Sequence, residues 1–175
     1  MRRSLEATVQ QEPVVTPIPT VTDVPVMVPD TTEYEIDEEQ LIMAARVEEA
    51  SKSMDLIMRT VVAEAGNQGY DGMRAVAQVI YDRRYNSTYN FGNTFEEIIY
   101  AENQFCTPYS GDISPWYPDV LAACEAVFYC GDFVFDQPVH YFYVASKVSD
   151  STLRWFETKQ YVGTIGAHTF RSEGS

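Results

Sequence analysis

The stretch SMDLIMRTVVAEAGNQGYDGMRAVAQVIYDRR, residues 53–84, carries the clearest structural pattern in the chain. Apolar side chains recur at helical spacing on both sides of a glycine-containing run at residues 66–69, which is typical of a turn. One helix is predicted to begin at Ser53, a suitable N-cap, and to end near Gly66. A second is predicted to begin at a cap at Asp71 and to end near Arg84. The stretch therefore predicts two helices joined by a glycine turn.

Weaker patterns on either side complete the fold prediction. A helix is expected at about residues 38–51, and the capping-box spacing of Thr94 and Glu97 predicts a short helix from Thr94. Pro118 opens a further helix, for which Gly131 is the expected C-cap. Aromatic and β-branched residues, typical of strands, then follow at residues 139–144, 161–162 and 168–170. We expect an α+β fold in which helices are followed by a small antiparallel β-sheet.

Residues 1–36 differ in composition from the rest of the chain. They place Pro13, Pro17, Pro19, Pro25 and Pro29 among valines and threonines. Such spacing favours extended, polyproline-like backbone. We expect a Pro/Val/Thr-rich acidic tail or linker, either tethering the domain to a larger assembly or free and flexible. Residues 37–175 are expected to form the folded domain, with its core at about residues 54–171.

Charge and hydropathy exclude several classes of function. The 175 residues carry a net charge of −14. This charge repels nucleic-acid phosphates, and no cluster of Lys and Arg offsets it, so we expect no nucleic-acid partner. No apolar run approaches the roughly 18 residues of a membrane span. Met1-Arg2-Arg3 resembles the basic start of a signal peptide, but residues 4–13 lack an apolar core, so a conventional signal peptide is not expected.

Cysteines and histidines give little support to metal or thiol chemistry. The three cysteines, Cys106, Cys124 and Cys130, contain no CxxC pair, and the two histidines lie 28 residues apart. We therefore expect neither a metal nor a cofactor, and we interpret the cysteines as free thiols. A cysteine peptidase or amidase, with Cys106 as nucleophile and His140 or His168 as base, is a rival hypothesis. We expect His168 to be a hydrogen-bonded structural histidine.

Glu64 is the candidate catalytic residue. It stands in the last turn of the predicted helix, directly before the glycine turn. Its neighbours Val61, Val62 and Ala63 predict partial burial, and the C-terminal end of a helix carries a negative partial charge. Both effects disfavour the ionised carboxylate and suit an acid that still holds a proton near neutral pH. A solvated glutamate at a helix end is the other interpretation of this spacing.

Residues 56–84 resemble the signature L-A-R-T-V-x-x-E-A-R-G-E-x-x-x-G-Q-x-A-V-A-x-V-I-x-N-R of the SleB-type cell wall hydrolases, the family of the spore cortex-lytic enzymes. Four further family-like motifs follow in the family's order, at residues 102–105 (ENQF), 111–113 (GDI), 140–143 (HYFY) and 164–170 (TIGAHTF). Together the five motifs span about residues 54–171. Five matches in the right order make the resemblance specific, although each is weak alone.

The resemblance implies a lysozyme-like fold and cleavage of peptidoglycan glycan strands between N-acetylmuramic acid and N-acetylglucosamine. The catalytic glutamate of the signature falls on Glu64. Its arginine and second glutamate fall on Gly66 and Gln68, which puts a second carboxylate role there in doubt. A lytic transglycosylase needs one carboxylate, which acts first as acid and then as base. If a partner acid exists, Asp71 and Asp112 are the candidates, although Asp71 is more simply a helix cap.

The substrate contacts follow from the same resemblance. Gln104, Tyr143 and Thr164 are the candidate contacts to sugar hydroxyl and acetamido groups. Aromatic side chains are further candidates for stacking on sugar rings, namely Trp116, Tyr117, Tyr141 and Tyr143.

The expected site of action is the bacterial cell wall, although the negative net charge of the chain weakens docking on anionic wall polymers. Without a signal peptide the export route is open, and a phage-borne endolysin, carried in a virion or released through a holin, fits the sequence. The alternative outside the enzymes is an inactive glycan-binding or structural module, for example a virion component.

Overall fold

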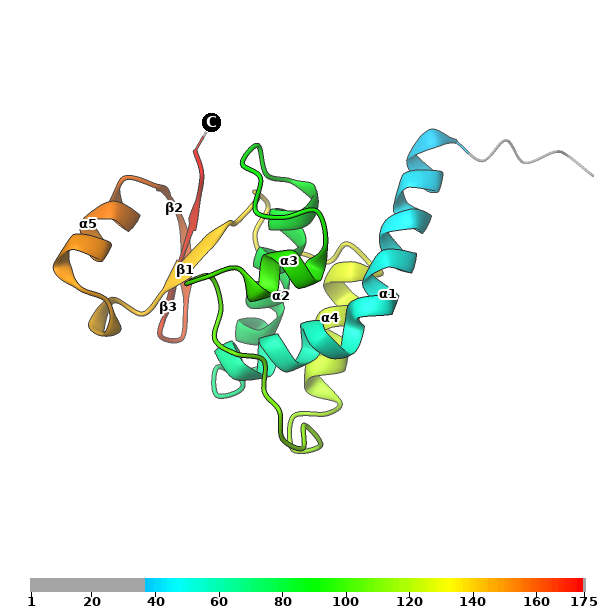
Figure 1. Cartoon of the computed structure of the whole chain (residues 1–175), viewed down its shortest axis with the longest axis horizontal. Coiled ribbons are helices and arrows are strands. Elements are labelled where there is room, and N and C mark those ends of the chain that lie inside the picture. Colours follow the sequence, from blue (N-terminus) through cyan, green and yellow to red (C-terminus); the bar gives the residue numbers. More distant parts are fainter. Residues whose placement is uncertain (1–36, 175) are drawn as a thin grey trace, which may run out of the picture. The chain divides into compact units, whose positions relative to one another are not determined.

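The computed structural model of the protein describes residues 37–174. The predicted tail at residues 1–36 lies outside the described residues. The remainder forms one compact unit, in which a group of helices is followed by a three-stranded sheet (Figure 1). No helix within residues 37–174 has the length and apolar character to span a membrane.

Helix α1, Glu38–Ala65, is a single helix of 28 residues, so the prediction of two separate helices was wrong. The expected cap Ser53 is instead buried within α1, where its hydroxyl donates to the Glu96 carboxylate at 2.9 Å. The helix bends near its middle (Figure 1), where the Ser51 hydroxyl donates to the Val47 carbonyl at 2.8 Å. Such back-bonding by serine bends helices without ending them. The predicted end is confirmed, because Gly66 is the C-cap.

Helix α2, Gly69–Tyr85, lies against α1, and the short turn between them was predicted. The predicted cap was wrong, because α2 begins two residues before Asp71 and its N-cap, Gln68, makes no capping bond with its side chain. Asp71 is exposed and lies 3.8 Å from the Arg74 guanidinium. The helix begins earlier than predicted because Gly69 takes a positive φ of 72°, which lets the chain turn directly into α2.

Two short helices complete the helical part. Helix α3, Phe95–Tyr100, has the predicted cap, in which the Glu97 amide donates to the Thr94 hydroxyl at 3.1 Å. The Glu97 carboxylate accepts from the Asn93 amide at 2.6 Å, one residue before the position of the standard capping box. Helix α4, Asp119–Phe128, follows Pro118 as predicted and ends at Tyr129, two residues before the expected Gly131.

The sheet contains β1 (Tyr141–Tyr143), β2 (Gln160–Ile165) and β3 (His168–Ser172) in the antiparallel order β1-β3-β2. The α+β prediction is therefore confirmed, and the three strands lie where they were expected. Between β1 and β2 the chain adds a 3-10 turn, Ala145–Lys147, and a helix, α5, Asp150–Glu157, which were not predicted. Helix α5 has no buried residue, so its sequence lacks the broad apolar stripe of a core helix.

Two buried polar side chains of α2 connect the helices to the sheet. The Gln78 amide oxygen accepts from the main-chain amides of Val134 and Phe135, at 2.9 and 3.0 Å. The Asp82 carboxylate accepts from the Val139 amide at 2.8 Å, and burial raises the pKa of this group. These bonds fix the segment that leads into β1. They therefore hold the sheet in place against α2, at the edge of the helical core.

Candidate active site

Glu64 lies half-buried in the last turn of α1 and lines an open cleft of about 500 Å³. Its Oε1 accepts a hydrogen bond of 2.5 Å from the main-chain amide of Cys106. Because the last turns of α1 are packed in the core through Val61, Val62 and Ala65, the carboxylate is held from both sides, by its helix and by the loop that carries Cys106. Such fixation suits a residue that must present a carboxyl group to a bond in a bound substrate.

The loop after α3 forms one wall of this cleft. It contributes Asn103, which takes a positive φ of 61°, together with Gln104, Phe105 and Cys106. Further along, the Arg59 guanidinium of α1 donates to the carbonyls of Tyr109 and Gly111, both at 3.0 Å. The loop is thus anchored to α1 at two places, at Glu64 through Cys106 and earlier in the helix at Arg59.

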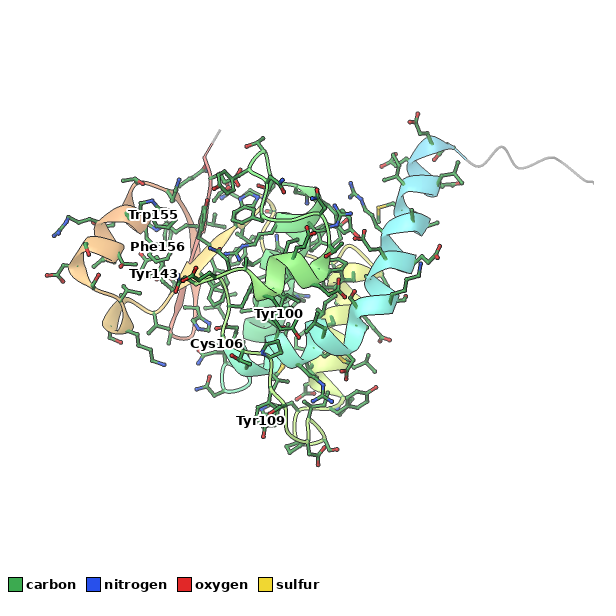
Figure 2. All side chains as sticks on the ribbon, viewed as in Figure 1. Tyr100, Cys106, Tyr109, Tyr143, Trp155 and Phe156 are labelled. Carbon is green, nitrogen blue, oxygen red and sulfur yellow. The ribbon has the colours of Figure 1, made fainter. Side chains whose placement is uncertain are left out.

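The opposite wall comes from β1, the 3-10 turn and α5. Tyr143 stacks on Phe156, with ring centroids 4.3 Å apart and an interplanar angle of 11°. Figure 2 shows Trp155, Phe156 and Tyr143 gathered between α5 and the sheet, with Cys106 on the loop that forms the other wall. Lys147 of the 3-10 turn lines the same part of the cleft as Glu64.

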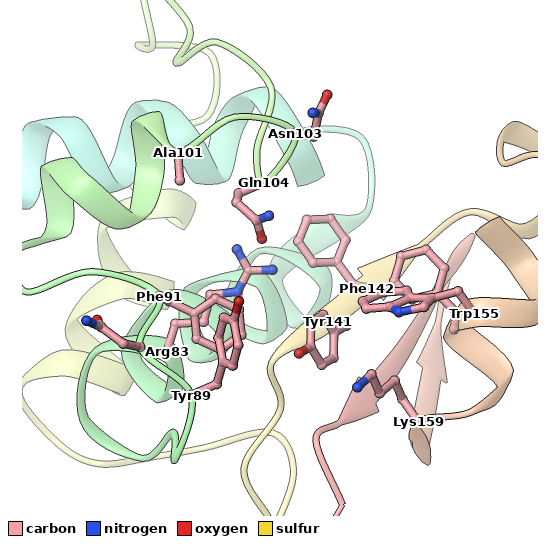
Figure 3. Close-up of a pocket in the computed structure, with 12 residues that line it drawn as sticks. Arg83, Tyr89, Phe91, Ala101, Asn103, Gln104, Tyr141, Phe142, Trp155 and Lys159 are labelled. Atoms are coloured by element: carbon pink, nitrogen blue, oxygen red, sulfur yellow. The ribbon is translucent and has the colours of Figure 1, made fainter.

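The cleft continues beyond Gln104 into a second part of about 480 Å³. The two parts share four lining residues, Asn103, Gln104, Phe142 and Phe156. Figure 3 shows this second part, in which the Arg83 guanidinium is directed toward the Gln104 side chain and Trp155 stands beside Lys159. A groove with Glu64 in one part and aromatic walls in the other is suited to an extended ligand with ring faces.

His168 begins β3 and lines the part of the cleft that holds Glu64. It is 6% exposed and its ring lies against Phe142 and Phe170, as expected of a structural histidine. The expectation that it is fully hydrogen-bonded was wrong, because its Nδ1 has no partner among the described residues. Burial lowers the pKa of this imidazole, although the Glu64 charge acts in the opposite direction. The ring is therefore neutral at neutral pH.

The environment of Cys106 disfavours the cysteine-nucleophile hypothesis. Burial, and after it the charge of Glu64, raises the pKa of the Cys106 thiol above its usual range. A nucleophilic cysteine needs the opposite shift. His140 does not line the cleft: its ring faces the Asn86 carbonyl and the Ser172 hydroxyl in the interior.

Of the three predicted substrate contacts, two line the cleft and the third does not. Gln104 lines both parts of the cleft. Tyr143 lines the part beside Glu64 and is buried, and its hydroxyl accepts from the Arg171 guanidinium at 3.2 Å. Thr164 is exposed on β2, contacts the Tyr161 hydroxyl at 3.2 Å and lines neither part.

The alternative acids and two of the candidate aromatics lie outside the cleft lining. Asp112 accepts from the amide and the hydroxyl of Ser114, at 2.9 and 2.6 Å, and these bonds lower its pKa. The Trp116 indole donates to the Gly66 carbonyl at 2.8 Å. Asp71 and Tyr117 are exposed elsewhere, so the lining retains Tyr141 and Tyr143 of the four aromatic candidates.

Several lining residues were not singled out from the sequence, namely Arg83, Asn103, Lys147, Trp155, Phe156 and Lys159. Arg83 ends the helical signature, which offered a usable signal. The aromatic pair Trp155–Phe156 in an otherwise polar segment offered another. The lysines carried no local pattern, because only the folded chain brings them to the groove. Among residues 37–174, no group of three or more His, Cys, Asp or Glu side chains is placed to bind a metal ion.

Comparisons with known proteins identify the family and the fold of the chain. The family model described as Cell Wall Hydrolase matches residues 67–171, and no curated protein matches the chain in sequence. The crystal structure of the catalytic domain of the Bacillus cereus SleB protein is similar, with a TM-score of 0.52 and 22% identity over 70% of this chain and 91% of that one. The catalytic domain of the germination-specific lytic transglycosylase SleB from Bacillus anthracis gives the same TM-score and identity over 69% and 93%. The SleB catalytic-domain fold and the family match agree, and the chain belongs to the cell wall hydrolase family.

Proposed function

We propose that the protein cleaves peptidoglycan glycan strands between N-acetylmuramic acid and N-acetylglucosamine as a lytic transglycosylase, with Glu64 as its single catalytic residue. Membership of the cell wall hydrolase family supports the substrate. The similarity to a structure described as a lytic transglycosylase supports the type of reaction. The position of Glu64, fixed by the Cys106 amide inside the cleft, supports the residue.

The number of carboxylates in the cleft lining supports a mechanism with a single catalytic acid. Among the residues that line its two parts, Glu64 is the only carboxylate. A hydrolase of the retaining or inverting kind uses two carboxylates, one as acid and the other as nucleophile or base. A transglycosylase takes its nucleophile from the sugar, so one carboxylate is sufficient.

In the proposed reaction, protonated Glu64 donates its proton to the glycosidic oxygen while the bond from this oxygen to the muramic acid C1 breaks. The sugar passes through an oxocarbenium-like state. Its own C6 hydroxyl then attacks C1, and the ionised Glu64 accepts the hydroxyl proton. The products are a 1,6-anhydro sugar and a free 4-hydroxyl group on the leaving strand, and Glu64 regains its starting protonation state. Gln104 and Tyr143 are the proposed contacts to the bound glycan.

Mass spectrometry of digested peptidoglycan tests this proposal. The native chain is expected to release anhydro-muropeptides, and Glu64→Gln to lower their rate of release about 10³-fold, the scale of a lost general acid. Glu102→Gln is the matched control, since Glu102 is an exposed carboxylate on the same loop as Gln104 and outside the cleft lining. Products with hydrated reducing ends would show that the enzyme is a hydrolase that positions a water molecule, and not a transglycosylase. Full activity in Glu64→Gln would overturn the role of Glu64.

The second candidate function is an inactive glycan-binding module. The open cleft with its aromatic walls favours binding in either case. If the native chain releases no product but is retained on peptidoglycan, the binding module replaces the enzyme.

A further inference from the structure

The second part of the cleft contains two positive charges that have no partner carboxylate. Arg83 and Lys159 both line it, and neither forms an ion pair with any described residue. The cations that do pair with carboxylates, Lys52, Arg59, Arg74 and Arg84, lie outside the lining of the cleft.

Among the described residues, Arg83 has no carboxylate within ion-pair distance, and the charges of Glu64 and Glu173 act on it from farther away. It is 5% exposed, and its Nε donates to the His140 carbonyl at 2.7 Å. Its guanidinium carbon lies 4.8 Å from the centroid of the Phe91 ring and 4.6 Å from that of Phe105. The Nη1 atom has no hydrogen-bond partner among the described residues. Burial lowers the pKa of Arg83 to about 10, so the group still carries its charge at neutral pH.

Lys159 is held in a similar way from the other side. Its Nζ lies 5.5 Å from the centroid of the Tyr141 ring and 5.2 Å from that of Trp155. Figure 3 shows the ammonium group beside these rings at the rim of the same pocket. Aromatic rings attract cations without neutralising them, so both side chains are positioned and remain available to an anion.

A cation buried without a partner costs free energy, which a bound anion recovers. The positive charge in this part of the cleft contrasts with the net charge of −14 of the chain. Carboxylates occur over most of the chain, but Glu64 is the only carboxylate among the lining residues. The arm of the cleft formed by Arg83, Trp155 and Lys159, which we name the cationic arm, therefore has the composition of an anion site with an aromatic wall.

We infer that the cationic arm binds a carboxylate carried by the glycan strand, with Arg83 and Lys159 as its ligands and Trp155 against the attached sugar. This inference rests on the proposed function, since that function supplies a strand in which muramic acid bears a carboxylate. The carboxylate belongs either to the lactyl group of a muramic acid that bears no peptide or to the peptide attached to a substituted one. The planar guanidinium of Arg83, which is directed toward Gln104 in this arm (Figure 3), is of the kind that binds a carboxylate of either source through paired N–H donors.

Binding of the Glu64→Gln chain to insoluble peptidoglycan tests the inference without turnover. Peptidoglycan whose carboxylates have been converted to neutral amides is compared with untreated peptidoglycan. Amidation is expected to weaken binding at least about tenfold, the scale of one lost charged hydrogen bond. General electrostatics predicts the opposite sign, because removal of wall charge reduces its repulsion of a chain of net charge −14. Equal or stronger binding to the amidated wall would overturn the inference.

The variant Lys159→Gln tests whether the carboxylate binds in the cationic arm. In the Glu64→Gln background it is expected to weaken binding to untreated peptidoglycan about fivefold to tenfold and to remove most of the sensitivity to amidation. Arg154→Gln is the matched control, since Arg154 is an exposed cation of the neighbouring helix α5 outside the lining. If both variants behave alike, the cationic arm is not the site.

Two further measurements distinguish the two possible sources of the carboxylate and separate this inference from the proposed function. An amidase removes the peptides and frees the lactyl carboxyl groups to which they were joined, so retained binding shows that the arm accepts a lactyl carboxylate and lost binding assigns the peptide. Product release by the native chain is measured in parallel. If no product appears while binding still depends on the carboxylate, the proposed reaction fails and the anion site stands. If product appears at equal rates from both walls and binding is insensitive to amidation, the reaction stands and the anion site fails.

Discussion

Glu64 and Cys106 meet at the floor of the cleft, and each alters the chemistry of the other. The Cys106 amide donates to the Glu64 carboxylate, which keeps the acid in one position. In return, the negative charge of Glu64 adds to burial in raising the pKa of the Cys106 thiol. The thiol is therefore a probe of the charge on the catalytic candidate.

We expect Glu64→Gln to accelerate alkylation of Cys106 by iodoacetamide at pH 8. Removal of the negative charge lowers the thiol pKa, and a larger fraction of the group is then the reactive thiolate. We expect a rate increase of about threefold to tenfold. Rates for each cysteine are measured by peptide mass spectrometry.

Two other cysteines serve as internal references in that experiment. Cys130 is exposed and Cys124 is buried, where burial raises its pKa to about 12. Neither is expected to change its rate in the variant. An unchanged rate at Cys106 would show that Glu64 carries no negative charge next to the thiol at pH 8.

At the scale of elements, the turn between α1 and α2 is fastened to the turn between β2 and β3. The Gln68 Oε1 atom accepts from the Ala167 amide at 3.0 Å. Gly166 permits this approach, since its φ is +55° and a Cβ atom there would collide with the Gln68 side chain. Gln68 stands where the family signature has its second glutamate, and the role observed here is that of an acceptor, which an amide or a carboxylate can fill.

Gln68→Ala is accordingly expected to lower the free energy of unfolding by about 0.5–1 kcal/mol, the net contribution of one exposed hydrogen bond. Urea unfolding followed by circular dichroism measures the change. Gln68→Glu is the matched control, and it should keep native stability because its carboxylate accepts the same bond. A loss of stability in Gln68→Glu equal to that in Gln68→Ala would contradict the acceptor role.

For the molecule as a whole, the described core and cleft draw on every part of residues 50–170, from helix α1 to strand β3. The family match at residues 67–171 covers most of this range, although it begins three residues after Glu64. The helix that carries Glu64 is nevertheless part of the same core as the matched segment, through Val61, Val62 and Ala65. Every residue to which the proposed reaction assigns a role lies within residues 37–174.

A chain of residues 37–175 is expected to keep the melting temperature of the full chain to within a few degrees and its rate of muropeptide release to within about twofold, because it keeps every described residue of the core and the cleft. Differential scanning fluorimetry and product analysis on isolated peptidoglycan measure the two quantities. If activity falls while the melting temperature is kept, residues 1–36 contribute to substrate capture, as the tether hypothesis predicts.

The elements that the sequence predicted well are those decided by local pattern. Apolar periodicity at residues 53–84 marked the two central helices, because burial of one face imposes a period of about 3.6 residues. Thr94 and Gly66 marked helix ends, since caps depend on neighbouring backbone groups. The predicted break at Ser53 failed, because its hydroxyl found a partner 43 residues away in Glu96. A local pattern does not contain such a partner.

The sequence by itself determined the α+β class, the place of Glu64 at a helix end and the ordered motifs of the family. Only the tertiary structure decided what surrounds Glu64. A loop and a strand far along the chain bring Gln104, Cys106 and Tyr143 into the same cleft lining as Glu64. Thr164, which belongs to a motif that matches the family equally well, lies outside the cleft. The unpaired charges of Arg83 and Lys159 were equally hidden. Whether a cation has a partner depends on distances across the fold, and these exist only once the chain has packed.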